Sequence, residues 1–153
     1  MKTKSVVIDF ERSIGPWLGR TMKLVDYHMN EAFDNAGLDL TKEQMVVLKK
    51  LDEQDGLNQN ELAYLTYRNK SSLTRLLAKM ESKKYIQRRQ GKTDKRVNQV
   101  FLTEVGKGVY QKTRPVIKSL ITKMERNISD QEKTEMIALL KRVQRNFEPL
   151  IDF

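Results

Sequence analysis

The chain has 153 residues, a hydrophobic fraction of 39%, and 29 Lys and Arg against 20 Asp and Glu, which gives a net charge of +9. This length favours one compact domain, or two small lobes that share a core. The absence of cysteine excludes a disulfide framework, a thiol nucleophile and a thiol redox switch. The sequence has neither a run of about 18 apolar residues nor a signal-peptide core, so it predicts a cytoplasmic protein that does not enter the membrane.

A long helix is predicted near the start of the chain. Apolar residues recur mostly every three or four positions from Ile14 to Ala36, with Ser13 as the expected cap and Pro16 tolerated in the first turn. Gly37 is the expected stop signal. Two interpretations of the apolar stripe stay open, because the helix could belong to the core of one chain or pack against a second copy.

Two short helices are expected next, each opened by a capping box. In this pattern an N-terminal Ser, Thr, Asp or Asn side chain and a Glu or Gln three residues later each bind the other's main-chain N–H group. Thr41 with Gln44 forms the first pair, and Asn58 with Glu61 forms the second. A short connector, residues 66–69, separates the second of these helices from the one that follows.

The helix expected at residues 70–83 has one apolar face and one basic, hydroxyl-rich face. Its apolar residues follow the period of an α-helix at Leu73, Leu76, Leu77 and Met80. Two short helices joined by a tight connector, the second of them basic on its outer face, predict a helix-turn-helix. A helical hairpin with no role in DNA binding would show the same apolar spacing.

A β-hairpin is expected directly after this helix, with strands at residues 85–90 and 97–102 and a polar turn that contains glycine. A hairpin in this place is a wing, the second DNA-contacting element of a winged helix. The alternative is an ordinary hairpin with a solvated tip. The density of cations argues against it, because the hairpin carries Arg88, Arg89, Lys92, Lys95 and Arg96.

The excess positive charge is confined to this helix and hairpin. From Arg68 to Arg96 there are 11 Lys and Arg and 2 Asp and Glu, a balance of +9. Subtracting them from the totals of 29 and 20 leaves 18 basic and 18 acidic residues in the rest of the chain. A solvated face normally mixes both signs of charge, so this segment predicts a polyanionic partner.

Two further helices complete the chain. Thr103 is expected to open a second long helix that ends near Asn127, and Ser129 begins a third capping box with Glu132. The last helix is expected to end near Phe147, before Pro149.

These elements together resemble the multiple antibiotic resistance regulator (MarR) family of bacterial transcription factors. The resemblance rests on Asn60-Glu61-Leu62-Ala63, on residues 69–77, and on Asp94-x-Arg96 followed by Leu102-Thr103-x-x-Gly106. The order of the elements also matches over nearly the whole chain. One departure is Lys84, which stands where the family often has glycine at the end of the recognition helix.

The resemblance implies a mainly α fold with a small β-hairpin. A winged helix-turn-helix lobe, residues 38–102, would adjoin a helical dimerisation lobe, residues 13–37 and 103–153. The resemblance also implies a homodimer in which the first helix and the last two helices interleave. Its expected function is that of a transcriptional regulator, a ligand-responsive repressor that binds an inverted repeat in double-stranded DNA.

In such a complex Arg96 would enter the minor groove, with Asp94 holding the fork of its guanidinium by a bidentate bond. Ser71, Ser72, Thr74 and Arg75 would face the major groove, where an arginine can reach a guanine edge. The full set of expected DNA-binding residues is Asn69, Lys70, Ser71, Ser72, Thr74, Arg75, Lys79, Arg88, Arg89, Lys92, Asp94, Lys95 and Arg96.

Many members of the family bind small phenolic or aromatic acids in a crevice between the two lobes. The residues expected to line such a crevice here are Trp17, Arg20, Met22, Tyr27, His28 and Met45. Plain core packing is the alternative interpretation for the Trp and Met residues. No cofactor, metal site or catalytic residue is expected.

Three other classes of function compete with DNA binding as interpretations of this sequence. An enzyme is disfavoured because one histidine without cysteine cannot form a Cys/His couple or a His/Cys zinc quartet, and no phosphate-binding glycine motif is present. A membrane-surface helix is disfavoured because the basic helix has only a narrow apolar stripe. A winged helix that binds another protein, without specific DNA readout, remains the alternative.

Overall fold

The computed structural model describes residues 5–147, and within this range it contains six helices and one two-stranded antiparallel sheet. The predicted fold class, mainly α with a small β-hairpin, is confirmed. The elements are α1 (Ile14–Asn35), α2 (Lys42–Glu53), α3 (Gln59–Leu65), α4 (Lys70–Ser82), β1 (Ile86–Gln90), β2 (Asn98–Leu102), α5 (Glu104–Met124) and α6 (Asp130–Arg145). The expected stop at Pro149 lies outside the described residues.

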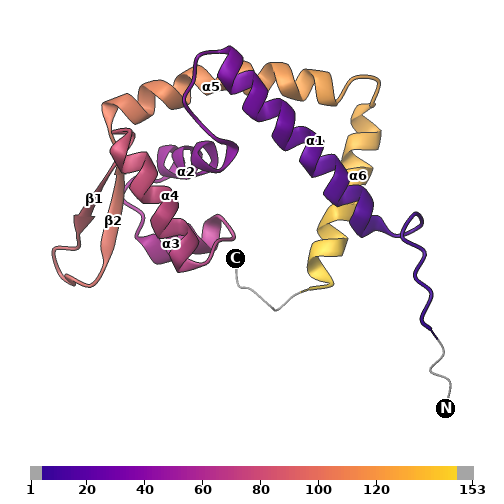
Figure 1. The fold of residues 1–153 in the computed structure, drawn as a ribbon, viewed down its shortest axis with the longest axis horizontal. Helices are drawn as coiled ribbons and strands as arrows, with labels where there is room; N and C mark the ends of the chain where they lie inside the picture. Colours follow the sequence, from indigo (N-terminus) through magenta and orange to yellow (C-terminus); the bar gives the residue numbers. More distant parts are fainter. Residues whose placement is uncertain (1–4, 148–153) are drawn as a thin grey trace.

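The elements fall into two groups that α5 connects (Figure 1). Helices α2, α3 and α4 and the hairpin gather around the start of α5, while α1 crosses α5 and α6 turns away from its far end. The buried apolar core is drawn from residues 33–102, and it includes the fully buried Phe33, Leu48, Leu62, Leu73, Leu77, Met80 and Val100. The helix-turn-helix and the hairpin therefore hold most of the core, to which α1 adds Phe33 and against which Val109 and Ile117 of α5 pack.

Helix α1 ends as predicted at Gly37, whose φ of +69° lies in the left-handed region that glycine adopts readily. The Gly37 N–H donates to the Asp34 carbonyl at 3.0 Å, and the Leu38 N–H donates to the Phe33 carbonyl at 2.9 Å. This pair of bonds is a Schellman motif, which satisfies the last carbonyls of a helix. At the other end, Ser13 takes the cap position, but its hydroxyl donates to the Asp9 carbonyl and caps no helical N–H.

All three predicted capping boxes are confirmed. Thr41 with Gln44 opens α2, Asn58 with Glu61 opens α3, and Ser129 opens α6 with its N3 glutamate. In the second box the Asn58 side chain accepts from the Glu61 N–H at 2.8 Å, and the Glu61 carboxylate accepts from the Asn58 N–H at 3.0 Å. These bonds join residues only three positions apart, so the sequence carries all the information they need.

Lys84, which stands where the family often has glycine, adopts the backbone conformation that ends α4. It follows the cap residue Lys83 and adopts a φ of +63°. Its N–H donates to the Glu81 carbonyl at 2.9 Å, and the Tyr85 N–H donates to the Met80 carbonyl at 3.0 Å. A Schellman motif thus ends α4 at Ser82, and a lysine occupies the left-handed position that would suit glycine.

The hairpin is joined to the connector between α2 and α3 and to the start of α5. Ile86 pairs with Leu102 and Gln90 with Asn98 across the hairpin. On the other side of β2, the Gly56 N–H donates to the Val100 carbonyl at 3.0 Å. The base of the hairpin is therefore fixed in position, while its tip, beyond the last paired residues, projects from the sheet.

Helices α5 and α6 bury little of their surface. Helix α5 continues through Pro115 and ends at Met124, earlier than expected, and α6 has no buried residue. The large apolar side chains that α1, α5 and α6 leave exposed are Ile14, Trp17, Met22, Leu24, Tyr27, Val105, Ile121, Met124, Met136, Ile137 and Leu139. Within one copy of the chain, these helices have more apolar surface than they bury.

Candidate nucleic-acid interface

The outer face of α4 is basic and free of acids. Lys70, Thr74, Arg75 and Lys79 are exposed on it, while Leu73, Leu77 and Met80 are buried on the inner face. Among the described residues, none of the ion pairs involves a cation of this outer face. Its charge is therefore available to an external anion.

The smaller polar side chains at the start of α4 are bound within the protein. The Asn69 carboxamide oxygen accepts from the Ser72 N–H at 2.8 Å and from the Ser71 hydroxyl at 3.0 Å. The Ser72 hydroxyl is half-buried and accepts from the Arg68 guanidinium at 2.6 Å. Asn69 and Ser72, two of the expected DNA-binding residues, thus hold the first turn of α4 in shape.

The tip of the wing presents Lys92, Lys95 and Arg96, all exposed. Asp94 orders this turn through the main chain, because its carboxylate accepts from the Arg96 N–H at 2.9 Å. The expected bidentate bond from Asp94 to the Arg96 guanidinium is wrong, since no such ion pair occurs in the described part of the chain. A carboxylate two residues before an N–H forms this short turn locally, and the arginine residue stays exposed.

A groove brings the wing and α4 together. It has a volume of about 190 Å³ and is lined by Lys70 and Thr74 of α4, by Arg96 of the wing, and by residues of α3 and its cap. Residues more than twenty positions apart in the sequence thus face the same space. The arrangement can contact one nucleic-acid duplex with two elements, a helix and a hairpin tip.

The two arginines on β1 differ from the rest of the wing. The Arg88 guanidinium donates to the Glu81 carboxylate at 3.0 Å, and the Arg88 N–H donates to its other oxygen at 2.9 Å. These bonds hold the pKa of the Glu81 carboxyl below its usual value, and the bond to the Arg88 side chain has the largest effect. The Arg89 guanidinium lies 4.8 Å from the ring centre of Phe101 and donates to Gln87. Arg88 is thus already paired with an acid, unlike the cations at the tip.

The six expected ligand-binding residues do not line a common pocket. Trp17 and Arg20 stack on each other at 4.2 Å on the exposed start of α1, whereas Met45 is only 8% exposed in the core. Met22 and Tyr27 are exposed, and of the six only His28 lines the cavity of about 550 Å³ beside α1 and α5. Within this single chain the six residues therefore do not form one crevice, because a resemblance in the order of the elements does not show which side chains face one another.

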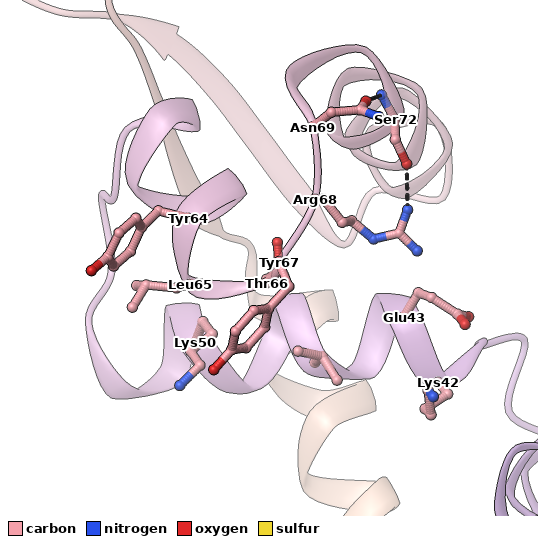
Figure 2. Close-up of a pocket in the computed structure, with 11 residues that line it drawn as sticks. Lys42, Glu43, Lys50, Tyr64, Leu65, Thr66, Tyr67, Arg68, Asn69 and Ser72 are labelled. Atoms are coloured by element: carbon pink, nitrogen blue, oxygen red, sulfur yellow. Dashed lines mark hydrogen bonds between the residues drawn. The ribbon is translucent and has the colours of Figure 1, made fainter. Parts of the chain in front are cut away.

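A larger cavity, of about 850 Å³, lies between α2 and the connector that joins α3 to α4 (Figure 2). Its lining includes Lys42, Lys50, Tyr64, Tyr67 and Arg68. Arg68 points into the space between α4 and α2, with its bond to Ser72 drawn as a dashed line. No sequence motif indicates this cavity, because its lining converges from three helices and the connector between two of them.

The described residues contain no group of three or more His, Cys, Asp or Glu side chains that could hold a metal ion. Membrane-spanning length and hydropathy are likewise not reached by any helix between residues 5 and 147.

Comparison with known proteins identifies the family. A MarR family sequence profile matches residues 40–97. The HTH-type transcriptional regulator SarZ of Staphylococcus aureus is 32% identical over 111 residues, which cover 72% of this chain and 74% of SarZ. The uncharacterized HTH-type transcriptional regulator YybA of Bacillus subtilis is 29% identical over 131 residues, 86% of each chain.

Two solved structures share the fold. A mutant of MarR from E. coli, complexed with operator DNA, superimposes with a TM-score of 0.76 at 29% identity, covering 89% of this chain and 99% of that chain. The second is BpsR of Bordetella bronchiseptica, whose DNA binding is regulated by 6-hydroxynicotinic acid. It superimposes with a TM-score of 0.82 at 17% identity, and the match covers 91% of this chain and 98% of BpsR.

A helix-turn-helix followed by a two-stranded wing defines the winged helix-turn-helix class. The chain belongs to the MarR family of transcriptional regulators, and it is a DNA-binding protein.

Proposed function

We propose that this regulator works as a homodimer that represses transcription from an inverted-repeat operator, and that it acts by binding, without catalysing a reaction. The observation that carries the proposal is the groove in which Lys70, Thr74 and Arg96 face the same space. Exposed cations on both sides of it, without an ion-pair partner among the described residues, suit contact with phosphates. We further propose that the protein works in the cytoplasm, because its target DNA lies there.

The dimer is supported by the apolar surface that α1, α5 and α6 leave uncovered. We propose that residues 13–37 and 103–153 form the dimerisation lobe and that residues 38–102 form the DNA-binding lobe. Two copies of α4 related by a two-fold axis would enter successive major grooves, roughly 34–36 Å apart. Such a pair requires an operator with two-fold symmetry.

Each class of side chain has a separate role in this proposal. Arg75 contacts a base edge in the major groove and sets the preferred half-site, with Ser71 and Thr74 beside it. Arg96 occupies the flanking minor groove, where the negative potential favours arginine. The remaining cations contact phosphates and add affinity without sequence preference: Lys70, Lys79, Arg89, Lys92 and Lys95.

Two experiments test the proposal. The first selects bound sequences from a random duplex library, and the second measures affinity for the selected site at several salt concentrations. We expect a two-fold symmetric site, and an affinity that falls by orders of magnitude between about 50 and 200 mM salt. A site without symmetry would reject the dimeric operator. Affinity that hardly depends on salt would favour the alternative, a winged helix that binds another protein.

We also propose that a small aromatic acid acts as effector in the cavity beside α2. Two tyrosines and Arg68 in its lining suit an aromatic ring that carries a carboxylate. A carboxylate bound to the Arg68 guanidinium would compete with Ser72, and Ser72 lies in the first turn of α4. Effector binding would thereby change the start of the helix that contacts DNA.

Calorimetric titration with 6-hydroxynicotinic acid and with 4-hydroxybenzoate tests the effector site. We expect Arg68→Gln to abolish binding of whichever acid the wild type binds, and Trp17→Ala to leave it unchanged. Loss of binding in Trp17→Ala, with binding unchanged in Arg68→Gln, would show that the effector binds at the start of α1.

A further inference from the structure

We propose that Glu81 is a positioning residue that fixes the wing relative to α4, so that DNA contacts of the wing depend on an acid that touches no DNA. The inference rests on the proposed function, because it concerns the DNA contacts of α4 and of the wing tip.

One carboxylate joins the last turn of α4 to the middle of β1. Its Oε2 atom accepts from the Arg88 N–H at 2.9 Å, and its Oε1 atom accepts from the Arg88 guanidinium at 3.0 Å. Arg88 is the central residue of β1 and lies opposite Val100, which is fully buried. The bond to the main chain therefore holds the strand itself, and the wing tip extends from that strand.

The electrostatic setting of Glu81 points to the same role. Glu81 lies in the C-terminal turn of α4, where the helix dipole disfavours an acid. Between Arg68 and Arg96 the chain has only two acids, Glu81 and Asp94, and each accepts from the main-chain N–H of an arginine of the wing. Both acids thus act on the conformation of the hairpin backbone.

Arg88 takes part in this contact in place of a phosphate. Its side chain is 25% exposed and that of Glu81 is 39% exposed, so the pair is partly screened from solvent. Pairing also neutralises a carboxylate that would otherwise repel the DNA backbone. Arg88, which the sequence placed among the DNA-binding residues, therefore has a role in holding the wing.

A positioning role and simple charge repulsion predict effects of opposite sign when Glu81 is replaced in Glu81→Gln. Removal of a negative charge beside DNA normally tightens binding, and it would also release Arg88 toward a phosphate. If Glu81 positions the wing, the same substitution weakens binding, and only where the wing has DNA to contact. The sign of the change therefore distinguishes the positioning role from simple electrostatics.

The experiment compares two duplexes that carry the selected operator, one ending at the major-groove half-sites and one extended into the flanking minor grooves. For Glu81→Gln we expect about a tenfold loss of affinity on the extended duplex and less than about a twofold change on the short one. Glu125→Gln is the matched control, since it also removes one acid from an ion pair. In this case the partner is Lys133, whose ammonium lies 3.0 Å from the Glu125 carboxylate at the end of α5. We expect the control to bind both duplexes like the wild type.

Equal or tighter binding of Glu81→Gln on the extended duplex would overturn the proposal. A general loss of stability would weaken binding to both duplexes alike, which would also overturn it. The background variant Arg88→Gln gives a second measurement, because it removes the guanidinium and keeps the residue-88 N–H, so Glu81→Gln should still weaken binding to the extended duplex. If the wild type itself binds both duplexes equally, the proposed wing contact fails, and the test separates that result from a failure of Glu81.

Discussion

At the scale of single residues, the wing tip shows how a short-range bond prepares a long side chain for binding. Asp94 accepts from the Arg96 N–H, and the Gly91 N–H donates to the Val97 carbonyl at 2.6 Å. These bonds shape the turn and leave the Arg96 guanidinium exposed. The arginine is thus presented by an ordered backbone, and its charge is not neutralised by the neighbouring acid.

We predict that Arg96→Ala weakens operator binding by about 1–3 kcal/mol while folding is unchanged. Asp94→Ala should have a smaller effect in the same direction, because it loosens the turn but keeps the guanidinium. Fluorescence anisotropy at one fixed salt concentration measures both. Lys112→Ala, which removes one positive charge from the exposed surface of α5, is the control and should bind normally. Wild-type affinity of Arg96→Ala would remove the wing tip from the interface.

At the scale of elements, the base of the wing and the start of α5 form one joint. The Thr103 N–H donates to the Tyr85 carbonyl at 3.1 Å, and the Thr103 hydroxyl accepts from the Gly106 N–H at 3.0 Å. A Cβ atom at Gly106 would lie 2.0 Å from the Tyr85 carbonyl oxygen. Glycine is thus required at this position by the close approach of two backbones. The Tyr85 carbonyl cannot move aside unless the hairpin that follows it also shifts.

We predict that Gly106→Ala destabilises the protein by more than about 2 kcal/mol, because the added methyl group overlaps a main-chain oxygen. Urea unfolding, followed by circular dichroism, measures the change. The matched control is Gly108→Ala in the same helix, where a Cβ would meet nothing within 4 Å. We expect this control to stabilise the protein by about 0.5–1 kcal/mol, the ordinary gain of alanine over glycine in a helix. Equal effects of the two substitutions would contradict the joint.

At the scale of the whole molecule, the chain combines a compact group of elements with long helices that find little to pack against. The core is drawn from residues 33–102, whereas α6 contributes no buried residue. Exposed apolar surface of this extent on a helix favours association with another chain. We propose that a second copy covers it.

We predict that the wild type is a dimer at micromolar concentration in sedimentation velocity, and that Leu139→Glu shifts it towards monomer. Leu139 is exposed on the apolar stripe of α6, so a charge there would be buried without a partner in the dimer. Ala138→Glu is the control, because it puts the same charge on the opposite face of the helix. A stable, folded monomer of the wild type would reject the dimer.

The sequence alone determined the features that depend on short-range bonds and on periodicity. The capping boxes at Thr41, Asn58 and Ser129 join residues three positions apart, and Gly37 ends its helix through bonds within one turn. Helix and strand patterns, together with the confinement of charge, therefore predicted the winged helix and its polyanionic partner. The motifs that the chain shares with the MarR family are also short stretches of sequence, such as Asp94-x-Arg96.

Only the tertiary structure decided which side chains meet across elements. The Lys83 ammonium lies 3.0 Å from the Asp39 carboxylate, 44 positions away, and no local pattern indicates that pair. The pairing of Arg88 with Glu81, the cavity beside Arg68 and the separation of Trp17 from Met45 are of the same kind. Each depends on the distance and angle at which packed helices and strands approach one another. These quantities arise from the fit of the whole core, so they become visible only when the chain has folded.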